Sequence, residues 1–170
     1  KSAKGNEFDG FISIRSRGQS SKNFAKKSYR LELLNHEKME VSSPLLGMPN
    51  ESDWILFGPY TDKSLIRNKL IFELSRRMGN YAPRSRFCEL IINGQCEGLY
   101  MLVEQIKRDK NRIDIAKLTN LDIYGNDVTG GYIFKYDRTD ANSKKIIRNR
   151  EIVYPNVLQA KQEEYLDAFF

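Results

Sequence analysis

The stretch YTDKSLIRNKLIFELSRRMG, from Tyr60 to Gly79, decides the fold because it carries the strongest helix signal in the chain. Asp62 is of a residue type that favours the helix N-cap, and Gly79 is of the type that favours the position after the last turn. Between them, apolar side chains recur at every fourth position, which predicts an amphipathic helix with one buried stripe. The residues of this stripe are Ile66, Leu70, Leu74 and Met78.

The segment after this helix predicts a β-hairpin. Two apolar runs, 86–92 and 98–103, flank the dipeptide Asn93-Gly94. Asn-Gly between two such runs is the strongest short-range signal for a hairpin, because both residues tolerate the positive φ of a type I′ turn. We therefore expect the two runs to pair as neighbouring antiparallel strands.

The two cysteines of the chain lie one on each arm of this hairpin. With a two-residue loop, Ile91 pairs with Cys96, and Leu99 pairs with Cys88. The two sulfur atoms then lie on opposite faces of the hairpin, so we expect no disulfide between them. Two thiols at this spacing are also too few to form a zinc site by themselves.

Further elements are predicted on both sides of the helix and the hairpin. The predicted strands are 11–15, 28–34, 54–57 and 132–136, and a second helix is predicted over 162–170. The clearest of these strands, 28–34, alternates between apolar and charged side chains, as a half-buried strand does. Along the chain, the predicted order is strands, one helix, more strands and a last helix. This order indicates an α+β fold, in which one helix packs across an antiparallel sheet.

The totals are those of an ordinary globular domain: 170 residues, of which 40% are hydrophobic and 29% charged. We therefore expect residues 1–170 to be a single domain or a fragment of one. No apolar run approaches the ~18 residues of a membrane span, and no signal peptide is visible. Because the second helix ends on Phe169 and Phe170 without a polar tail, we expect the natural protein to continue beyond residue 170.

The net charge of +6 favours anionic partners, such as nucleotides, acidic peptides, nucleic acid or a membrane surface. A solvated basic surface explains the same charge equally well. The aromatic side chains fall mostly at core-facing positions and not between lysines and arginines, as stacking platforms for bases would. Nucleic acid is therefore the least favoured partner.

The loop after the first predicted strand combines groups that bind phosphate. Arg17, the backbone amides around Gly18 and the hydroxyls of Ser20 and Ser21 could hold phosphate oxygens. The segment is not a Walker sequence, and it lacks the G-x-G-x-x-G spacing of ordinary kinases. A plain hairpin loop therefore remains the alternative interpretation.

Lys26 and Lys27 open the next predicted strand. Ordinary kinases place a lysine on a strand after their glycine-rich loop, where a helix carboxylate holds it near the phosphates. Glu73 and Glu104 are the candidate carboxylates. The alternative is that both lysines are solvated edge residues that discourage sheet aggregation.

Arg67-Asn68, near the start of the predicted helix, is a further candidate for anion binding. Asparagine is a poor helix former and is seldom found there without a hydrogen-bonding role, and a purely structural network is the alternative. The aspartates of the chain form no motif of a metal site. Asp137, which closes a strand opened by Gly130-Gly131, is the most interesting of them.

Several short segments match one family in the same order along roughly residues 12 to 165. They are RSRGQSS (15–21), AKKSYR (25–30), LLGMP (45–49), Asp53-Trp54, DKS (62–64), RNKL (67–70), Asn93-Gly94, GLY (98–100), EQI (104–106), GGYI (130–133) with Asp137, and Tyr154-Pro155. Together they resemble the CotH kinase family, the atypical protein kinases named after spore coat protein H. Gln19 replaces the family's usual asparagine, and the prolines that flank its double lysine are absent.

The resemblance implies a fold like the N-terminal lobe of a protein kinase and transfer of phosphate from ATP to serine, with Mg or Mn, by the full-length protein. The residues that it places at the nucleotide are Arg17, Gly18, Ser20, Lys27, Arg67, Asn68 and Glu104. The family's catalytic aspartate belongs to an Asp…Asn segment and its metal-binding aspartate to a Trp-Asp-x-Asp segment. Neither segment occurs in this chain, so we assign no catalytic or metal-binding residue and expect the chain alone to be inactive.

The resemblance also implies a secreted protein, or one of the cell envelope or spore surface, whose protein substrate stays open. The alternative function is a non-catalytic interaction module at such a surface. An exposed apolar patch on the folded chain would be its sign.

Overall fold

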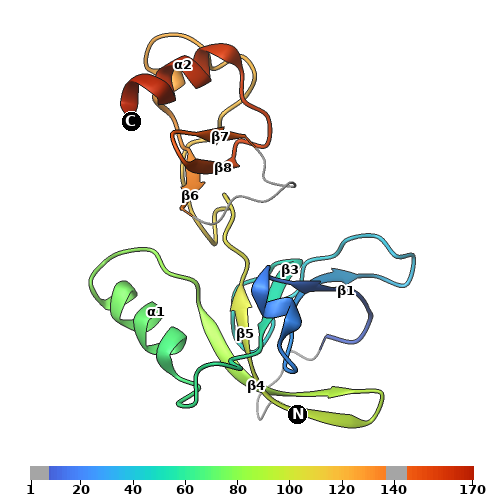
Figure 1. Cartoon of the computed structure of the whole chain (residues 1–170). Helices are drawn as coiled ribbons and strands as arrows, with labels where there is room; N and C mark the ends of the chain where they lie inside the picture. The colour runs from blue at the N-terminus through green and yellow to red at the C-terminus, as the bar shows by residue number, and fades with distance from the viewer. Residues whose placement is uncertain (1–7, 137–144) are drawn as a thin grey trace. The chain divides into compact units, whose positions relative to one another are not determined.

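The computed structural model describes residues 8–136 and 145–170, and it divides the chain into two compact units, Lys1–Gln105 and Ile106–Phe170 (Figure 1). Each unit contains an antiparallel sheet and one α-helix. The predicted α+β class is therefore confirmed. The expectation of a single domain or a fragment of one stays a prediction.

The first unit is built on a five-stranded sheet with the strand order β1-β2-β3-β5-β4. Its elements are β1 (Phe11–Arg17), the 3₁₀ turn η1 (Ser20–Asn23), β2 (Ser28–Leu34), β3 (Asp53–Phe57), α1 (Arg67–Arg77), β4 (Ser85–Ile92) and β5 (Gln95–Glu104). All the predicted strands of this region are therefore confirmed. The strand β1 lies at one edge, and β3, the most buried strand, lies in the middle.

Two apolar clusters lie on opposite faces of this sheet, because side chains alternate along each strand. The larger cluster packs against the connection between β2 and β3 and is centred on Trp54, Leu33 and Met48. The smaller cluster joins Ile55, Met101 and Val103 to Phe72 of α1. The helix therefore covers only part of its face of the sheet.

The helix α1 departs from the prediction in two ways. It begins at Arg67 and not at Asp62, whose carboxylate instead accepts hydrogen bonds from the backbone N–H groups of Ser64, at 3.0 Å, and Arg67, at 2.9 Å. Asp62 therefore holds the turn before the helix. The predicted buried stripe is also wrong, because its four residues are exposed, from Leu74 at 49% to Met78 at 69%.

The hairpin of β4 and β5 confirms the predicted turn, with φ of 51° at Asn93 and 80° at Gly94. Ile91 pairs with Cys96 as predicted, but the predicted pairing of Leu99 with Cys88 is wrong by one residue. The register shifts because Glu97 is an extra residue in β5, a β-bulge that the turn dipeptide alone does not reveal. Both cysteines are free, as expected.

The second unit contains a small sheet with the strand order β6-β8-β7 and the helix α2. Its elements are η2 (Asp127–Thr129), β6 (Ile133–Lys135), β7 (Ile146–Ile147), β8 (Arg150–Tyr154) and α2 (Ala160–Phe169). Leu166 of α2 packs on Ile147 and Ile152. The predicted strand and helix are confirmed, although α2 begins two residues early because Gln159 and Gln162 form a capping box.

The ionisation of Tyr132 at high pH tests the packing described for this unit. Its hydroxyl donates to the carbonyl of Val128 at 2.8 Å. Burial, and secondarily the neighbouring Tyr165, raise the pKa of Tyr132 to about 12. A raised pKa contributes stability that is complete below the ordinary value of ~10 and is lost as the pH rises from there towards 12. We expect Tyr132→Phe to remove the last step of the tyrosine absorbance titration, whereas an unchanged titration would contradict this assignment.

Candidate functional site

Four of the predicted nucleotide-binding residues lie on one loop at one end of the first sheet. Arg17 ends β1, Gly18 follows it, Ser20 begins η1, and Lys27 immediately precedes β2. Gly18 has a φ of +103°, and a Cβ atom there would lie only 1.8 Å from the hydroxyl oxygen of Ser21. The positive φ favours glycine at this position, and any larger residue would also require the Ser21 side chain to move.

A basic surface adjoins this loop on the same face of the sheet as α1, in the part of that face that the helix leaves uncovered. Arg15 pairs with Arg30 across β1 and β2, and Arg17 lies on the same face two residues further along. Partial burial, and secondarily the charge of Arg30, lower the pKa of Arg17. Arg30 also forms an ion pair with Asp53 at 2.8 Å. A bound anion would relieve the repulsion between these guanidinium groups.

A shallow cavity of about 100 Å³ lies on this surface, lined by Ser13, Arg15, Arg30, Leu31 and Glu32. Arg15 and Arg30 belong to segments that carry the resemblance, but they were not among the predicted nucleotide-binding residues. The alternation of β2, which places Arg30 and Glu32 opposite the apolar side chains, was the available signal.

The two lysines before β2 have different environments. The ammonium group of Lys26 donates to the carbonyl of Glu97 at 3.2 Å and lies 4.5 Å from the centre of the Tyr100 ring. Lys26 therefore fastens the loop to β5. Lys27 is exposed, so its ammonium group is available to a ligand over the loop.

Arg67 and Asn68 lie on another element, at the first turn of α1. The side chain of Arg67 is 78% exposed, and its nearest acidic partner is Asp62, at 3.5 Å. The hydroxyl of Ser64, and then the N–H groups of Arg67 and Ser64, lower the pKa of Asp62. This local network matches the structural alternative that the sequence left open.

Glu104 lies at the other end of the sheet. Strand pairing places Leu31, Trp54 and Glu104 side by side on three neighbouring strands. Leu31 is four residues from Lys27, so Glu104 is displaced from Lys27 by roughly 13 Å along the strand direction. Its carboxylate is 1% exposed and accepts two hydrogen bonds of 2.7 Å from Arg84, one from the backbone and one from the side chain. The structure therefore does not bring Glu104 to the loop.

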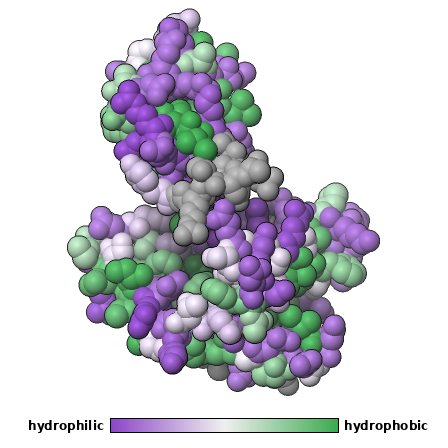
Figure 2. Space-filling model, viewed as in Figure 1, coloured by the Kyte–Doolittle hydropathy of each residue, from purple (hydrophilic) through white to green (hydrophobic). Residues whose placement is uncertain are grey.

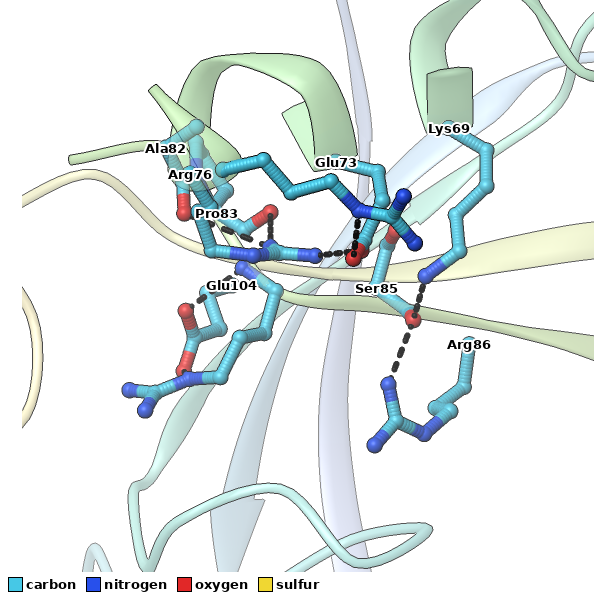
Figure 3. Close-up of polar contacts among 10 residues, drawn as sticks. Lys69, Glu73, Arg76, Ala82, Pro83, Ser85, Arg86 and Glu104 are labelled. Atoms are coloured by element: carbon cyan, nitrogen blue, oxygen red, sulfur yellow. Dashed lines mark hydrogen bonds and ion pairs between the residues drawn. The ribbon is translucent and has the colours of Figure 1, made fainter. Parts of the chain in front are cut away.

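Glu73, the other candidate partner of Lys27, belongs to a polar network between α1 and β4 (Figure 3). Arg76 donates to Glu73 and to the carbonyl of Pro83, the latter at 2.8 Å, and Lys69 donates to the carbonyl of Ser85 at 2.9 Å. The hydrogen bond from Arg76 is the main cause that lowers the pKa of Glu73. These anchors fix which side of α1 faces the sheet.

The described residues offer no group of three or more histidines, cysteines, aspartates or glutamates that could hold a metal ion. Asp137 lies outside the described residues. Within the same residues, no helix has the length and apolar character needed to cross a membrane.

The comparison with known families agrees with the motifs of the sequence. The family model described as CotH kinase protein matches residues 14–170, and the chain belongs to this family. A curated relative is the inner spore coat protein H of Bacillus subtilis (strain 168), which is 28% identical over 95 residues. The aligned part covers 56% of this chain but only 24% of that relative, so the chain matches about a quarter of its length.

Proposed function

We propose that this chain is the nucleotide-binding portion of a CotH-like atypical protein kinase that uses ATP. The observation that carries the proposal is the gathering of Arg17, Gly18, Ser20 and Lys27 on one loop beside the basic surface of β1 and β2. Guanidinium groups, ammonium groups and freed backbone amides donate the hydrogen bonds that phosphate oxygens accept. Membership of the family supports the same function.

In this proposal the residues of the loop bind and orient the triphosphate. Arg17 and Lys27 neutralise its charge, and Gly18 lets the backbone approach it closely. Phosphoryl transfer also requires a base and metal ligands, which we assign to no residue of this chain, so we expect the isolated chain to bind ATP without transferring phosphate. Arg67 and Asn68 stay predicted contacts, whereas Glu104 has its own partner in Arg84.

Replacing Lys27 with alanine is expected to weaken ATP binding by at least about tenfold, because one charge-assisted hydrogen bond contributes ~1.5–3 kcal/mol. Calorimetric titration of the 170-residue chain with ATP measures the affinity. Lys110→Ala is the matched control, since Lys110 is also exposed and its loss changes the net charge equally. Equal affinities of the two variants, or no saturable binding by the unaltered chain, would contradict the proposal.

A second candidate function is a non-catalytic interaction module. The exposed apolar stripe on α1 favours it, because contiguous apolar surface marks interaction sites. By analogy with the curated relative, named as an inner spore coat protein, we propose the spore surface or cell envelope as the location and a coat or envelope protein as the substrate or partner.

A further inference from the structure

The helix α1 presents an apolar surface to solvent in the middle of its outer side. Its members are Ile66, Leu70, Ile71, Leu74 and Met78, each about half exposed or more, and we call them the α1 stripe. Figure 2 shows the hydrophobic patch where α1 lies in Figure 1. Single exposed apolar residues need no explanation, but five along one side of a single helix do.

The orientation of α1 is fixed by contacts on its other side. Phe72 packs on Ile55, Met101 and Val103, and Lys69 and Arg76 donate to backbone carbonyls of residues 85 and 83. Rolling the helix to bury the stripe would remove Phe72 from its cluster and break these charge-assisted hydrogen bonds. The stripe is therefore presented to solvent by a rigid platform.

One exposed basic side chain lies near each end of the stripe, because Arg67 follows Ile66 and Arg77 precedes Met78. Arg67 and Arg77 are 78% and 77% exposed, and they lie ten residues apart, or roughly 15 Å along the helix. The helix carries four basic side chains and one acidic one, Glu73, which already contacts Arg76 and Arg77. The surface is thus apolar along its length, with a positive charge near each end.

We propose that the α1 stripe binds an amphipathic helix of a protein partner whose apolar face is flanked by carboxylates. The carboxylates would pair with Arg67 and Arg77, while the apolar faces of the two helices pack together. This goes beyond nucleotide binding and gives the second candidate function a partner of defined chemistry.

Two other occupants fit the surface less well. A second copy of the chain would bring like charges together at the ends of the stripe, and five apolar residues fall well short of the roughly 20–30 per side of a standard stable interface. A membrane surface is usually bound by a helix whose whole polar face is free and basic, whereas Lys69 and Arg76 of α1 already donate to the carbonyls of Ser85 and Pro83.

The test uses two synthetic helical peptides of about 18 residues, both with leucine at every third or fourth position. One carries glutamate and the other lysine beside the leucines. We expect the unaltered chain to bind the glutamate peptide at least about tenfold more tightly in a fluorescence anisotropy titration. We expect Leu74→Ser to lower this affinity by at least about tenfold and Arg77→Glu to abolish the preference for glutamate.

Leu121→Ser is the matched control, because Leu121 is exposed and lies outside α1. Circular dichroism of each variant verifies that it is folded. Equal binding of the two peptides, or full binding by Leu74→Ser, would overturn the proposal. The proposal would also be overturned if the chain associated with itself, or bound vesicles that contain phosphatidylserine, and Leu74→Ser abolished that association or binding. ATP titration of Leu74→Ser separates the two functions, because the stripe lies outside the proposed nucleotide loop.

Discussion

Replacing Trp54 with alanine is expected to lower the free energy of unfolding of the first unit by about 3–5 kcal/mol. Trp54 is fully buried in the middle of β3, at the centre of the larger apolar cluster. Its indole N–H also donates to the carbonyl of Glu51 at 3.0 Å, so the truncation removes a satisfied hydrogen bond as well as apolar contacts. The cavity left behind cannot close, because β2 and β5 hold β3 on both sides.

Chemical denaturation followed by circular dichroism measures this effect. Fluorescence is unsuitable because Trp54 is the only tryptophan. Tyr124→Ala is a matched control, since Tyr124 is an exposed aromatic residue outside the cluster, and its loss should change stability by less than about 0.5 kcal/mol. A loss below about 1 kcal/mol in Trp54→Ala would contradict the packing described for this cluster.

Replacing Glu104 with alanine is expected to destabilise the first unit by about 3 kcal/mol. The carboxylate is buried, and its two hydrogen bonds satisfy the backbone N–H and the side chain of Arg84. Without the carboxylate, the backbone N–H and the guanidinium group of Arg84 each lose their hydrogen bond to Glu104, and the ion pair between the two side chains is lost. Because the Arg84 side chain is 36% exposed and can be rehydrated, we expect the lower end of the range for broken buried ion pairs.

The same variant separates a structural from a ligand-binding role of Glu104. With the structural role, Glu104→Ala loses stability but, while folded, binds ATP as tightly as the unaltered chain. A variant that keeps full stability and loses ATP affinity would instead return Glu104 to the nucleotide site. Glu89→Ala is the control for the stability measurement, because Glu89 is exposed on the neighbouring strand.

Local signals in the sequence predicted most of the fold. The alternation of β2 and the Asn93-Gly94 turn are properties of a few adjacent residues, and the structure confirms both. The bulge at Glu97 was missed, because it adjusts the hairpin to the rest of the sheet. The beginning of α1 was missed because Asp62 caps a turn that leads into the helix.

The candidate site was predicted only in part. The residues that are neighbours in the chain, from Arg17 to Lys27, lie together on one loop. Glu104 is distant from it in both sequence and space, and its pairing with Arg84 depends on the register of β4 and β5. Arg30 reaches the same surface as Arg17 through the pairing of β1 with β2.

From the sequence alone we could predict the membership of a family, the strands β1 to β6 in their order along the chain, and the amphipathic character of α1, but not β7 or β8. The side of α1 that faces the sheet depends on tertiary contacts. The periodicity of a helix fixes which side chains share a face, because that depends on the helix alone. The direction in which that face points depends on groups from other elements, here the carbonyls of residues 83 and 85 and the cluster around Phe72.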